Sequence, residues 1–247
     1  MEEGQKPLIV PDYNLEDFPA LADANVLVAT PNYMNLFNAE AHASHLAAAC
    51  YWSKIGIKFN MVVVGRVFVH FARTQLCDLA LEQGFTHIYW VDDDAVIEPW
   101  HLPRLLLHDV EVVITPYFMR KPPHECGVLI STVGDFKDHD SYRGFDIEDL
   151  DQGLVEVDGG GTHALLMKTS VLEKAGFTDE NTTDWYSLKE ENARGRPYVM
   201  MPKIGTEDMY LCYRLKLKGV KIYCDTDIEA GHVGFAPVVT RAYREAM

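Results

Sequence analysis

The 247-residue sequence contains no apolar run long enough to span a lipid bilayer. Its first residues, MEEGQKPLIVPDYN, lack the basic start and the apolar stretch of a secretory signal. We therefore expect no transmembrane segment and a cytoplasmic protein.

Cysteine pairs with the spacing of a zinc site are also missing. The chain has five cysteines, an odd number, and no two of them form a C-x-x-C pair. A zinc site built on cysteine is therefore disfavoured, and we expect reduced thiols that are mostly buried.

Positive charge is scarce. The chain has 22 Lys and Arg against 37 Asp and Glu, which gives a formal net charge of −15. A surface this acidic repels phosphate backbones, so nucleic-acid binding is disfavoured. A bound nucleotide would need a metal ion or a local basic group to offset its own charge.

From Asn25 onward, short apolar runs alternate with segments of helical spacing. We predict strands at 25–30, 58–64, 87–91 and 110–116, and helices at 39–55, 68–83 and 99–108. Strands that are apolar on both faces and are separated by helices indicate a sheet covered on both sides. The prediction is an α/β fold with one domain, an open and mostly parallel sheet, and helices on both faces.

The second half of the sequence is less regular. It predicts a β run at 127–133, helices at 169–175 and 207–218, and a last strand at 220–224. The acidic stretch at 135–158 is interpreted as a solvated loop rather than a second metal site. No linker splits the chain, so we predict an N-terminal arm at 1–24, one domain at 25–234, and a C-terminal tail or lid at 235–247.

Three consecutive aspartates, Asp92, Asp93 and Asp94, follow the apolar run HIYWV. In an open parallel sheet, ligands bind beyond the carboxyl ends of the strands, and alternate residues can point the same way. Adjacent carboxylates repel one another unless a cation neutralises them, and Mg²⁺ and Mn²⁺ prefer carboxylate and phosphate oxygens. The triplet therefore predicts a divalent-metal site for a nucleotide diphosphate. The alternative is an acidic turn after a strand.

Other residues allow both a structural and a functional interpretation. Glu207 and Asp208 precede a helical run, where they suit the positive end of the helix dipole or supply a general base. His232 lies between glycines, where its imidazole could approach a metal. Arg73 is either a surface residue or a diphosphate contact. Arg120, with Lys121 beside it, belongs to the basic pair nearest the active end of the sheet.

Taken in order, these segments resemble the nucleotide-sugar glycosyltransferases of the GT-A fold, particularly glycosyltransferase family 2 and related viral and bacterial enzymes. The resemblance runs over about residues 25–234. Its fragments are VLVATPNY, FARTQLCDLAL, IYWVDDDAVIEP, GGGTHALLMKTSVLEKAG and GTEDMYLCYRLKLKGVKIYCDTDIEAGHVG. The acidic triplet, the Glu-Asp pair and the Gly-His-x-Gly segment form the most specific part of the set.

The resemblance implies a metal site for Mn²⁺ or Mg²⁺. The aspartate triplet resembles the DxD motif of the family, with Asp94 as the direct metal ligand and Asp92 in contact with ribose or a metal-bound water. His232 resembles the additional metal ligand of many GT-A enzymes. Asp93 belongs to the same donor-binding triplet, but the resemblance gives it no role of its own.

The resemblance also implies a donor site for a nucleoside-diphosphate sugar, a UDP- or GDP-sugar first of all. Thr30, Pro31 and Asn32 resemble part of the nucleoside pocket. Arg73 falls where the family often carries Arg-Asn, although Thr74 follows it here. Two glycines, Gly160 and Gly161, resemble the backbone segment that flanks the donor sugar.

The implied activity is transfer of a hexosyl or pentosyl group to the hydroxyl of a carbohydrate or glycan acceptor. Asp208, or less favourably Glu207, matches the acidic pair that supplies the base in inverting members. Trp185 and Tyr186 could stack on an acceptor sugar or anchor the core. Inversion is expected, but retaining relatives with a similar acidic pair leave the stereochemistry open.

Two alternatives belong to other classes. A nucleotidyltransferase would typically carry a glycine-rich, basic phosphate loop after the first strand, and ATPNYMNLFN has neither glycine nor a basic residue. A non-enzymatic module that binds a nucleotide sugar or a glycan is the second alternative. The presence of Asp94, Asp208 and His232 together argues against a decayed site.

Overall fold

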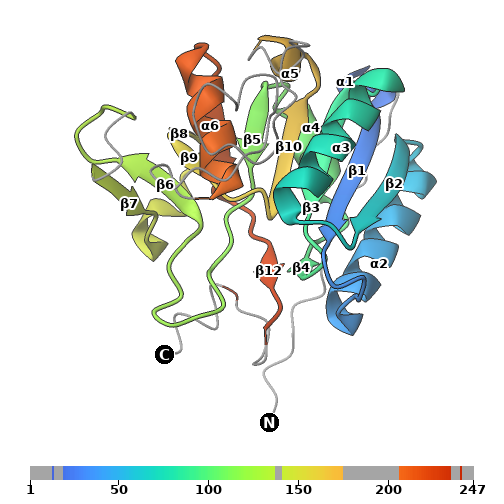
Figure 1. Ribbon diagram of the computed structural model, residues 1–247, viewed down its shortest axis with the longest axis horizontal. Coiled ribbons are helices and arrows are strands. Elements are labelled where there is room, and N and C mark those ends of the chain that lie inside the picture. The colour runs from blue at the N-terminus through green and yellow to red at the C-terminus, as the bar shows by residue number, and fades with distance from the viewer. Residues whose placement is uncertain (1–12, 14–18, 137–140, 175–205, 235–239, 241–247) are drawn as a thin grey trace.

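Seven strands form the main sheet of the computed structural model, which describes residue 13 and residues 19–136, 141–174, 206–234 and 240 (Figure 1). They are β1 (Asn25–Asn32), β2 (Lys58–Gly65), β3 (His87–Val91), β5 (Val112–Ile114), β8 (Leu154–Val157), β10 (Ala164–Lys168) and β11 (Ile222–Asp225). Their order across the sheet is β2-β1-β3-β10-β5-β11-β8.

Five of these seven strands point the same way, namely β1, β2, β3, β5 and β11. Strand β1 pairs in parallel with β2 and β3, and β5 pairs in parallel with β11. Strand β10 runs antiparallel between β3 and β5, and β8 runs antiparallel at the edge beside β11. The mostly parallel α/β sheet that the sequence predicts is therefore confirmed.

Helices cover both faces of the sheet (Figure 1). One face packs against α1 (Pro19–Asp23), α2 (Ala39–Ile55) and α4 (His101–Leu107), and the other against α3 (Val69–Glu82), α5 (Ser170–Lys174) and α6 (Glu207–Leu217). Successive strand residues serve opposite faces, so Val26 and Val28 join one core while Leu27 and Ala29 join the other. Burying each large apolar side chain stabilises the fold by about 1.5–3 kcal/mol.

The ends of helix α2 show how local sequence sets an element. Its bounds, Ala39–Ile55, are those predicted. The side chain of Asn38 accepts a hydrogen bond from the backbone N–H of Glu40 at 2.9 Å, which caps the start. Gly56 ends the helix in the left-handed conformation, with φ of 85°.

Two smaller sheets lie beside the main one. Strand β4 (Ala95–Val96) pairs with β12 (Gly231–His232), and β6 (Val128–Ser131) pairs with β7 (Tyr142–Gly144) and β9 (Gly159–Gly160). In the first of these sheets, His232 pairs with Ala95, the residue after the aspartate triplet. This pairing brings the C-terminal part of the domain against the end of β3.

Several predicted elements need correction. Strands β4, β7, β8, β9, β10 and β12 were not expected, and β10 is central to the sheet. A five-residue apolar run such as ALLMK cannot be told from a helical segment by periodicity alone. The acidic stretch predicted as a solvated loop contains β7, β8 and a short 3-10 helix, Ile147–Asp149.

The N-terminal arm predicted for residues 1–24 is wrong at its end. Residues 19–23 form helix α1, which contacts α4. The side chain of Leu21 is fully buried in the core, so this segment belongs to the domain. Residues 1–12 and 14–18 of that arm, the loop with Trp185 and Tyr186, and residues 235–239 and 241–247 of the C-terminal tail lie outside the described residues.

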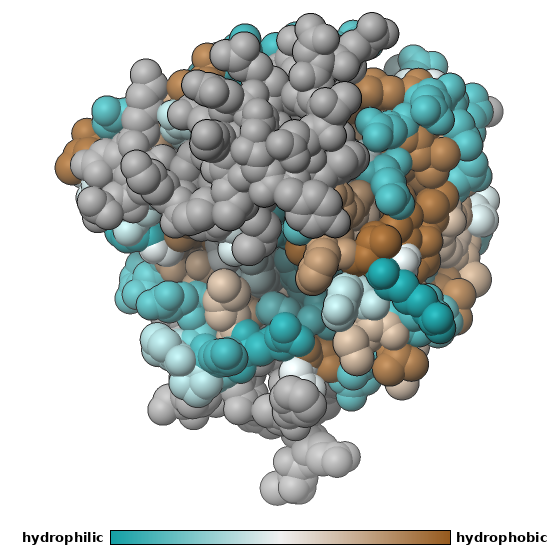
Figure 2. All heavy atoms as spheres, in the orientation of Figure 1, coloured by the Kyte–Doolittle hydropathy of each residue, from teal (hydrophilic) through white to brown (hydrophobic). Residues whose placement is uncertain are grey.

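The surface in Figure 2 mixes hydrophilic and apolar residues, with apolar ones gathered on the side of α3 and β2. Exposed apolar residues of that region include Met61, Val63 and Phe68. All five cysteines are free thiols and four are buried, as predicted. Within the described ranges, no helix is both long and apolar enough to cross a membrane.

Candidate metal and donor site

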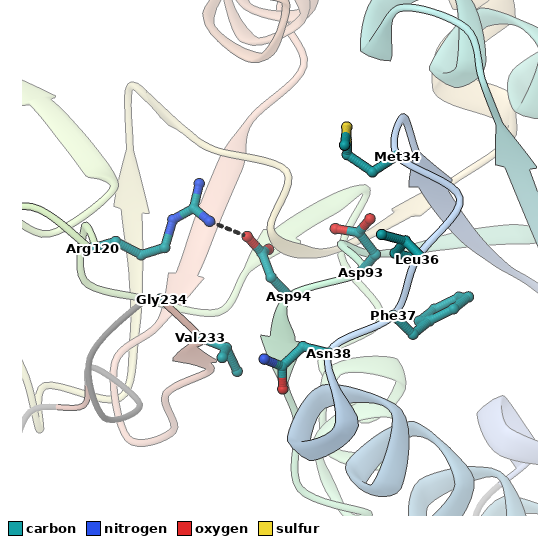
Figure 3. Close-up of a pocket in the computed structure, with 9 residues that line it drawn as sticks. All are labelled: Met34, Leu36, Phe37, Asn38, Asp93, Asp94, Arg120, Val233 and Gly234. Atoms are coloured by element: carbon teal, nitrogen blue, oxygen red, sulfur yellow. Dashed lines mark ion pairs between the residues drawn. The ribbon is translucent and has the colours of Figure 1, made fainter.

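The aspartate triplet forms the turn that leaves β3 at its carboxyl end. The backbone N–H of Asp92 donates to the carbonyl of His163 at 3.0 Å, and the N–H of Ala95 donates to the carbonyl of Asp92 at 3.0 Å. This turn gives the three carboxylates different surroundings. Asp92 contacts Arg73, Asp94 contacts Arg120, and Asp93 lies beside Leu36 in a pocket (Figure 3).

Asp94, His163 and His232 form a cluster with the composition of a metal site. One potential ligand atom from each residue lies within 4.8 Å of the other two. The Nδ1 atom of His163 is 3.7 Å from Asp94 Oδ1, and the Nε2 atom of His232 is 3.4 Å from Asp94 Oδ2. One carboxylate and two imidazoles are donors that divalent transition metals accept.

The second nitrogen of each histidine fixes which nitrogen faces Asp94. The Nε2 atom of His163 is 3.0 Å from the carbonyl of Gly231, and the Nδ1 atom of His232 is 3.1 Å from the carbonyl of Phe118. A carbonyl can only accept, so these nitrogens carry the hydrogens. In the neutral imidazoles, the lone pairs then face Asp94, which is the usual arrangement of metal-binding histidines. The donor set therefore fits a divalent cation.

His163 was missed by the sequence predictions. It follows Thr162 in the quoted segment GGGTHALLMK and precedes β10. Strand β10 pairs with β3 so that Ala164 lies opposite Val91, which places His163 beside the triplet. The signal was a histidine directly before an apolar run. It could have been used only if that run had been recognised as a strand beside β3.

Arg73 forms the second part of the site. Its side chain is 2% exposed, and its Nη2 atom lies 2.8 Å from Asp92 Oδ1. Its Nε atom lies 3.4 Å from Glu207 Oε1 and 3.6 Å from Asp208 Oδ1. The guanidinium thus faces three carboxylates from the start of α6 and the end of β3. Contact between Arg73 and a diphosphate stays a prediction.

Helix α6 places the predicted acidic pair in its first turn. Thr206 is the N-cap but makes no side-chain cap hydrogen bond. The hydroxyl of Thr162 donates to Asp208 Oδ1 at 2.5 Å. Through Thr162 and Arg73, Asp208 is connected to Asp92 and, past His163, to the metal cluster. The sequence predictions named Asp208 and the aspartate triplet, but not the contacts that connect them.

The carboxyl groups of the site differ in pKa. Burial raises the pKa of Asp92, but the Arg73 guanidinium and His163 outweigh burial and bring it down to about 2. Burial raises the pKa of Asp208, and the charge of Asp92 adds to this against the opposing effect of Arg73. Burial and the charge of Asp208 likewise raise the pKa of Glu207. The single positive charge of Arg73 does not neutralise three carboxylates, so the pKa values of Glu207 and Asp208 are raised.

The pKa of His163, one of the two histidines beside Asp94, is shifted by the same carboxylates. Burial lowers the pKa of His163, but its contacts with Asp92 and Asp94 outweigh burial and raise it. For Asp94, burial raises the pKa, and the hydrogen bond from His232 and the charge of His163 lower it overall.

A pocket of about 380 Å³ opens beside Asp94 (Figure 3). It is lined by Met34, Leu36, Phe37, Asn38, Asp93, Asp94, Arg120, Val233 and Gly234. Burial, with the neighbouring charges of Asp94 and Asp92, raises the pKa of Asp93 to about 6. A lining that combines apolar side chains with carboxylates suits a ligand that is partly apolar and partly cation-bound.

The predicted nucleoside residues do not line this pocket. Thr30 and Asn32 are buried at the end of β1, and none of Thr30, Pro31 and Asn32 is among the pocket-lining residues. The Asn32 side chain accepts from the N–H of Leu36 at 3.0 Å and donates to its carbonyl at 3.1 Å. Asn32 therefore shapes the loop whose residues line the pocket. Its contact with a nucleoside stays a prediction.

The glycines at 160 and 161 have a packing role in the structure. A Cβ atom on Gly161 would lie 2.0 Å from the Tyr117 hydroxyl, and one on Gly160 would lie 2.9 Å from the Gly127 carbonyl. Close packing of Tyr117 therefore requires glycine at 161. The Tyr117 ring in turn packs on His163, with ring centroids 4.5 Å apart. Backbone contact with a donor sugar stays a prediction.

No known protein-family model and no curated protein matches this sequence. Among solved structures, A197 from STIV aligns over 85% of this chain and 86% of its own, with 16% identity and a TM-score of 0.53. A glycosyltransferase involved in the glycosylation of the major capsid of PBCV-1 aligns over 90% of this chain and 98% of its own, with 13% identity and a TM-score of 0.37. The first likeness shows shared fold alone, and the second is too weak to carry a conclusion. The mixed α/β sheet itself is consistent with a single-domain GT-A-like fold.

Proposed function

We propose that the protein is a metal-dependent glycosyltransferase, which moves a sugar from a nucleoside-diphosphate sugar to an acceptor hydroxyl. The observation that carries this proposal is the convergence of Asp94, His163 and His232 at the carboxyl edge of the sheet. These residues come from three separate segments of the chain. The ordered resemblance to GT-A enzymes, with UDP- or GDP-sugars as the expected donors, supports the same activity.

Asp94, His163 and His232 would hold the Mn²⁺ or Mg²⁺ ion, with Asp92 beside them. When bound, such an ion stabilises the negative charge of a leaving diphosphate. The pocket beside Asp94 is large enough for a substantial part of the donor, and its apolar lining residues suit the nucleoside. Arg73 keeps Asp92 ionised, since its guanidinium lowers the pKa of that carboxyl.

Asp208 is the proposed general base, with Glu207 as the less favoured candidate. It would take the proton of the acceptor hydroxyl as the acceptor oxygen bonds to the anomeric carbon, while the bond to the diphosphate oxygen breaks with its electron pair. The raised pKa of Asp208 suits this role, because a base works best when its pKa approaches the working pH. Attack opposite the leaving group would invert the anomeric centre.

Thermal unfolding tests the proposal. UDP or GDP together with Mn²⁺ should raise the Tm more than either component alone. At about 100 times the dissociation constant, binding stabilises a protein by about 2.7 kcal/mol, which corresponds to roughly 5–10 °C here. The variant Asp94→Asn should lose this increase, and its affinity for Mn²⁺ should fall at least about tenfold.

The matched control is Asp93→Asn, which removes the same charge from the adjacent position outside the metal cluster. It should keep Mn²⁺ affinity within about threefold of the unmodified protein. Equal losses in both variants would point to general electrostatic attraction instead of a defined site. Absence of stabilisation by any nucleoside diphosphate would rule out the proposed function.

A further inference from the structure

A second pocket shares Arg120 with the first. It has a volume of about 330 Å³ and is lined by Met119, Arg120, Lys121, Pro122, Pro123, Glu125 and His232. Arg120 lines both pockets, and its Nη1 atom is 2.9 Å from Asp94 Oδ2. His232 gives the second pocket a wall in common with the metal cluster. A ligand there would sit next to one bound at Asp94.

The two pockets have opposite formal charge. The first contains Asp93, Asp94 and Arg120, which sum to −1. The second contains Arg120, Lys121 and Glu125, which sum to +1, without counting His232. In a protein of net charge −15, a positive pocket beside an acidic site is a local reversal of charge. Such a pocket favours an anionic ligand.

Lys121 is available to bind a ligand. It is exposed and makes no ion pair with any described residue, whereas Lys168, Lys174, Lys216 and Lys221 each pair with a carboxylate. Arg120 is half exposed, and Asp94 is its ion-pair partner within the described part of the chain. The guanidinium fork can therefore offer further N–H groups to a phosphate or carboxylate.

Hydrogen bonds within the loop that carries Arg120 and Lys121 stabilise its conformation. The N–H of Met119 donates to the carbonyl of Glu125 at 2.8 Å, and the N–H of His124 donates to the carbonyl of Lys121 at 2.9 Å. The buried His124 ring also hydrogen-bonds the Met119 carbonyl at 2.8 Å. These bonds fix the backbone at Arg120 and Lys121 before a ligand arrives, which reduces the entropy lost on binding.

We propose that this second pocket binds the acceptor, and that the acceptor is a saccharide carrying a phosphate or carboxylate group. This assignment rests on the proposed transferase function. Lys121 and Arg120 would bind the anionic group, while Met119 and the two prolines, Pro122 and Pro123, would pack on the apolar face of the sugar. The acceptor is placed here because Asp93 and Asp94 line the first pocket and not the second, so the metal and the donor diphosphate are assigned to the first.

Direct binding measurements test the proposal without any transfer reaction. Glucose 6-phosphate, glucuronate, glucose and inorganic phosphate would be titrated into the full chain by calorimetry, first alone and then with saturating UDP and Mn²⁺. The two anionic sugars should bind at least about tenfold more tightly than glucose and than inorganic phosphate. Their binding should persist when UDP and Mn²⁺ are present.

The decisive variant is Lys121→Glu, and its matched control is Lys58→Glu on the exposed start of β2. Both change the net charge by −2. Lys121→Glu should weaken binding of the anionic sugars at least about tenfold, while Lys58→Glu and the conservative Lys121→Arg should change it less than about threefold. Among the described residues, neither Lys58 nor Lys121 forms a hydrogen bond or ion pair with a proposed metal ligand or with Asp208.

Four results would overturn the assignment. They are equal weakening by Lys58→Glu, binding of glucose or inorganic phosphate as tight as that of the anionic sugars, no saturable binding of either anionic sugar, and displacement of the sugars by UDP. The last result would make the pocket part of the donor site. If UDP with Mn²⁺ fails to stabilise the protein but Lys121-dependent sugar binding remains, the transferase proposal fails and the saccharide-anion pocket stands.

Discussion

Two ionic clusters in this protein are built around a single arginine each, and they differ in balance. Arg73 faces Asp92, Glu207 and Asp208. Arg104 on α4 contacts the fully buried Asp225 through two nitrogens, at 2.6 and 3.0 Å, and also contacts Asp227. His108 adds a further contact to Asp225 at 2.7 Å. Arg104 therefore faces two carboxylates, one of which also contacts His108, whereas Arg73 faces three.

The pKa values follow this difference. Burial raises the pKa of Asp225, but hydrogen bonds from His108 and Arg104 outweigh it and bring the pKa to about 2. Around Arg73, Asp92 is satisfied in the same way, while the pKa values of Glu207 and Asp208 are raised. A matched cluster stabilises the fold. An excess of buried carboxylates costs stability, and strongly shifted pKa values of this kind are typical of functional sites.

The largest expected contrast comes from Asp208→Asn. Loss of the proposed base should reduce transfer about 10²–10⁴-fold. The free energy of unfolding at pH 7 should not fall, since ionisation of a carboxyl with a raised pKa costs stability and the Asn side chain still accepts from Thr162. Activity assays and urea unfolding of the same samples measure both effects. A variant that transfers normally would remove Asp208 from the mechanism.

Arg73→Met should cause the largest loss of stability. It leaves the buried carboxylates without their cation, which typically costs about 3–5 kcal/mol in the free energy of unfolding. The control is Arg143→Met, which removes the surface pair with Asp149 and should cost less than about 1 kcal/mol. Urea denaturation of both variants checks this. Similar small losses would mean that the Arg73 cluster is not under electrostatic strain.

Asp225→Asn should have a smaller effect that depends on pH. The folded pKa of about 2 lies below the ordinary 3.8, so this carboxyl stabilises the fold above about pH 4 and loses that contribution as the pH falls toward 2. At pH 7, the variant should be less stable by about 2 kcal/mol. The difference should disappear near pH 2 in urea unfolding curves. A loss that is constant with pH would indicate a packing defect instead.

The first half of the fold was predictable because its signals are local. Strands β1, β2 and β3 are short apolar runs, and α2 and α3 have helical spacing with a cap or a glycine near their ends. Predicted and observed bounds agree within about two residues. The second half was predicted less well, since β8, β10 and β12 gain their strand conformation from partners distant in the sequence.

Some residues of the candidate site could also be predicted from the sequence, and others could not. The chemistry of Asp94, Asp208 and His232 was visible in the sequence, because carboxylates after a strand and a histidine between glycines are unusual where they occur. His163 was missed because its position depends on β10. The role of Arg73 was also not visible, since its contacts with Asp92, Glu207 and Asp208 join residues 19 to 135 positions away.

The sequence by itself determined the α/β class, the acidic edge of the sheet and the residue types of the candidate divalent-metal site, since periodicity, strand-end position and ligand chemistry are local properties. Only the tertiary structure decided which residues meet. Antiparallel pairing of β10 with β3, and of β12 with β4, brings His163 and His232 to Asp94. Folding also buries Arg73 among more carboxylates than it can neutralise. Such long-range pairing depends on the packing of the whole sheet, which no short stretch of sequence encodes.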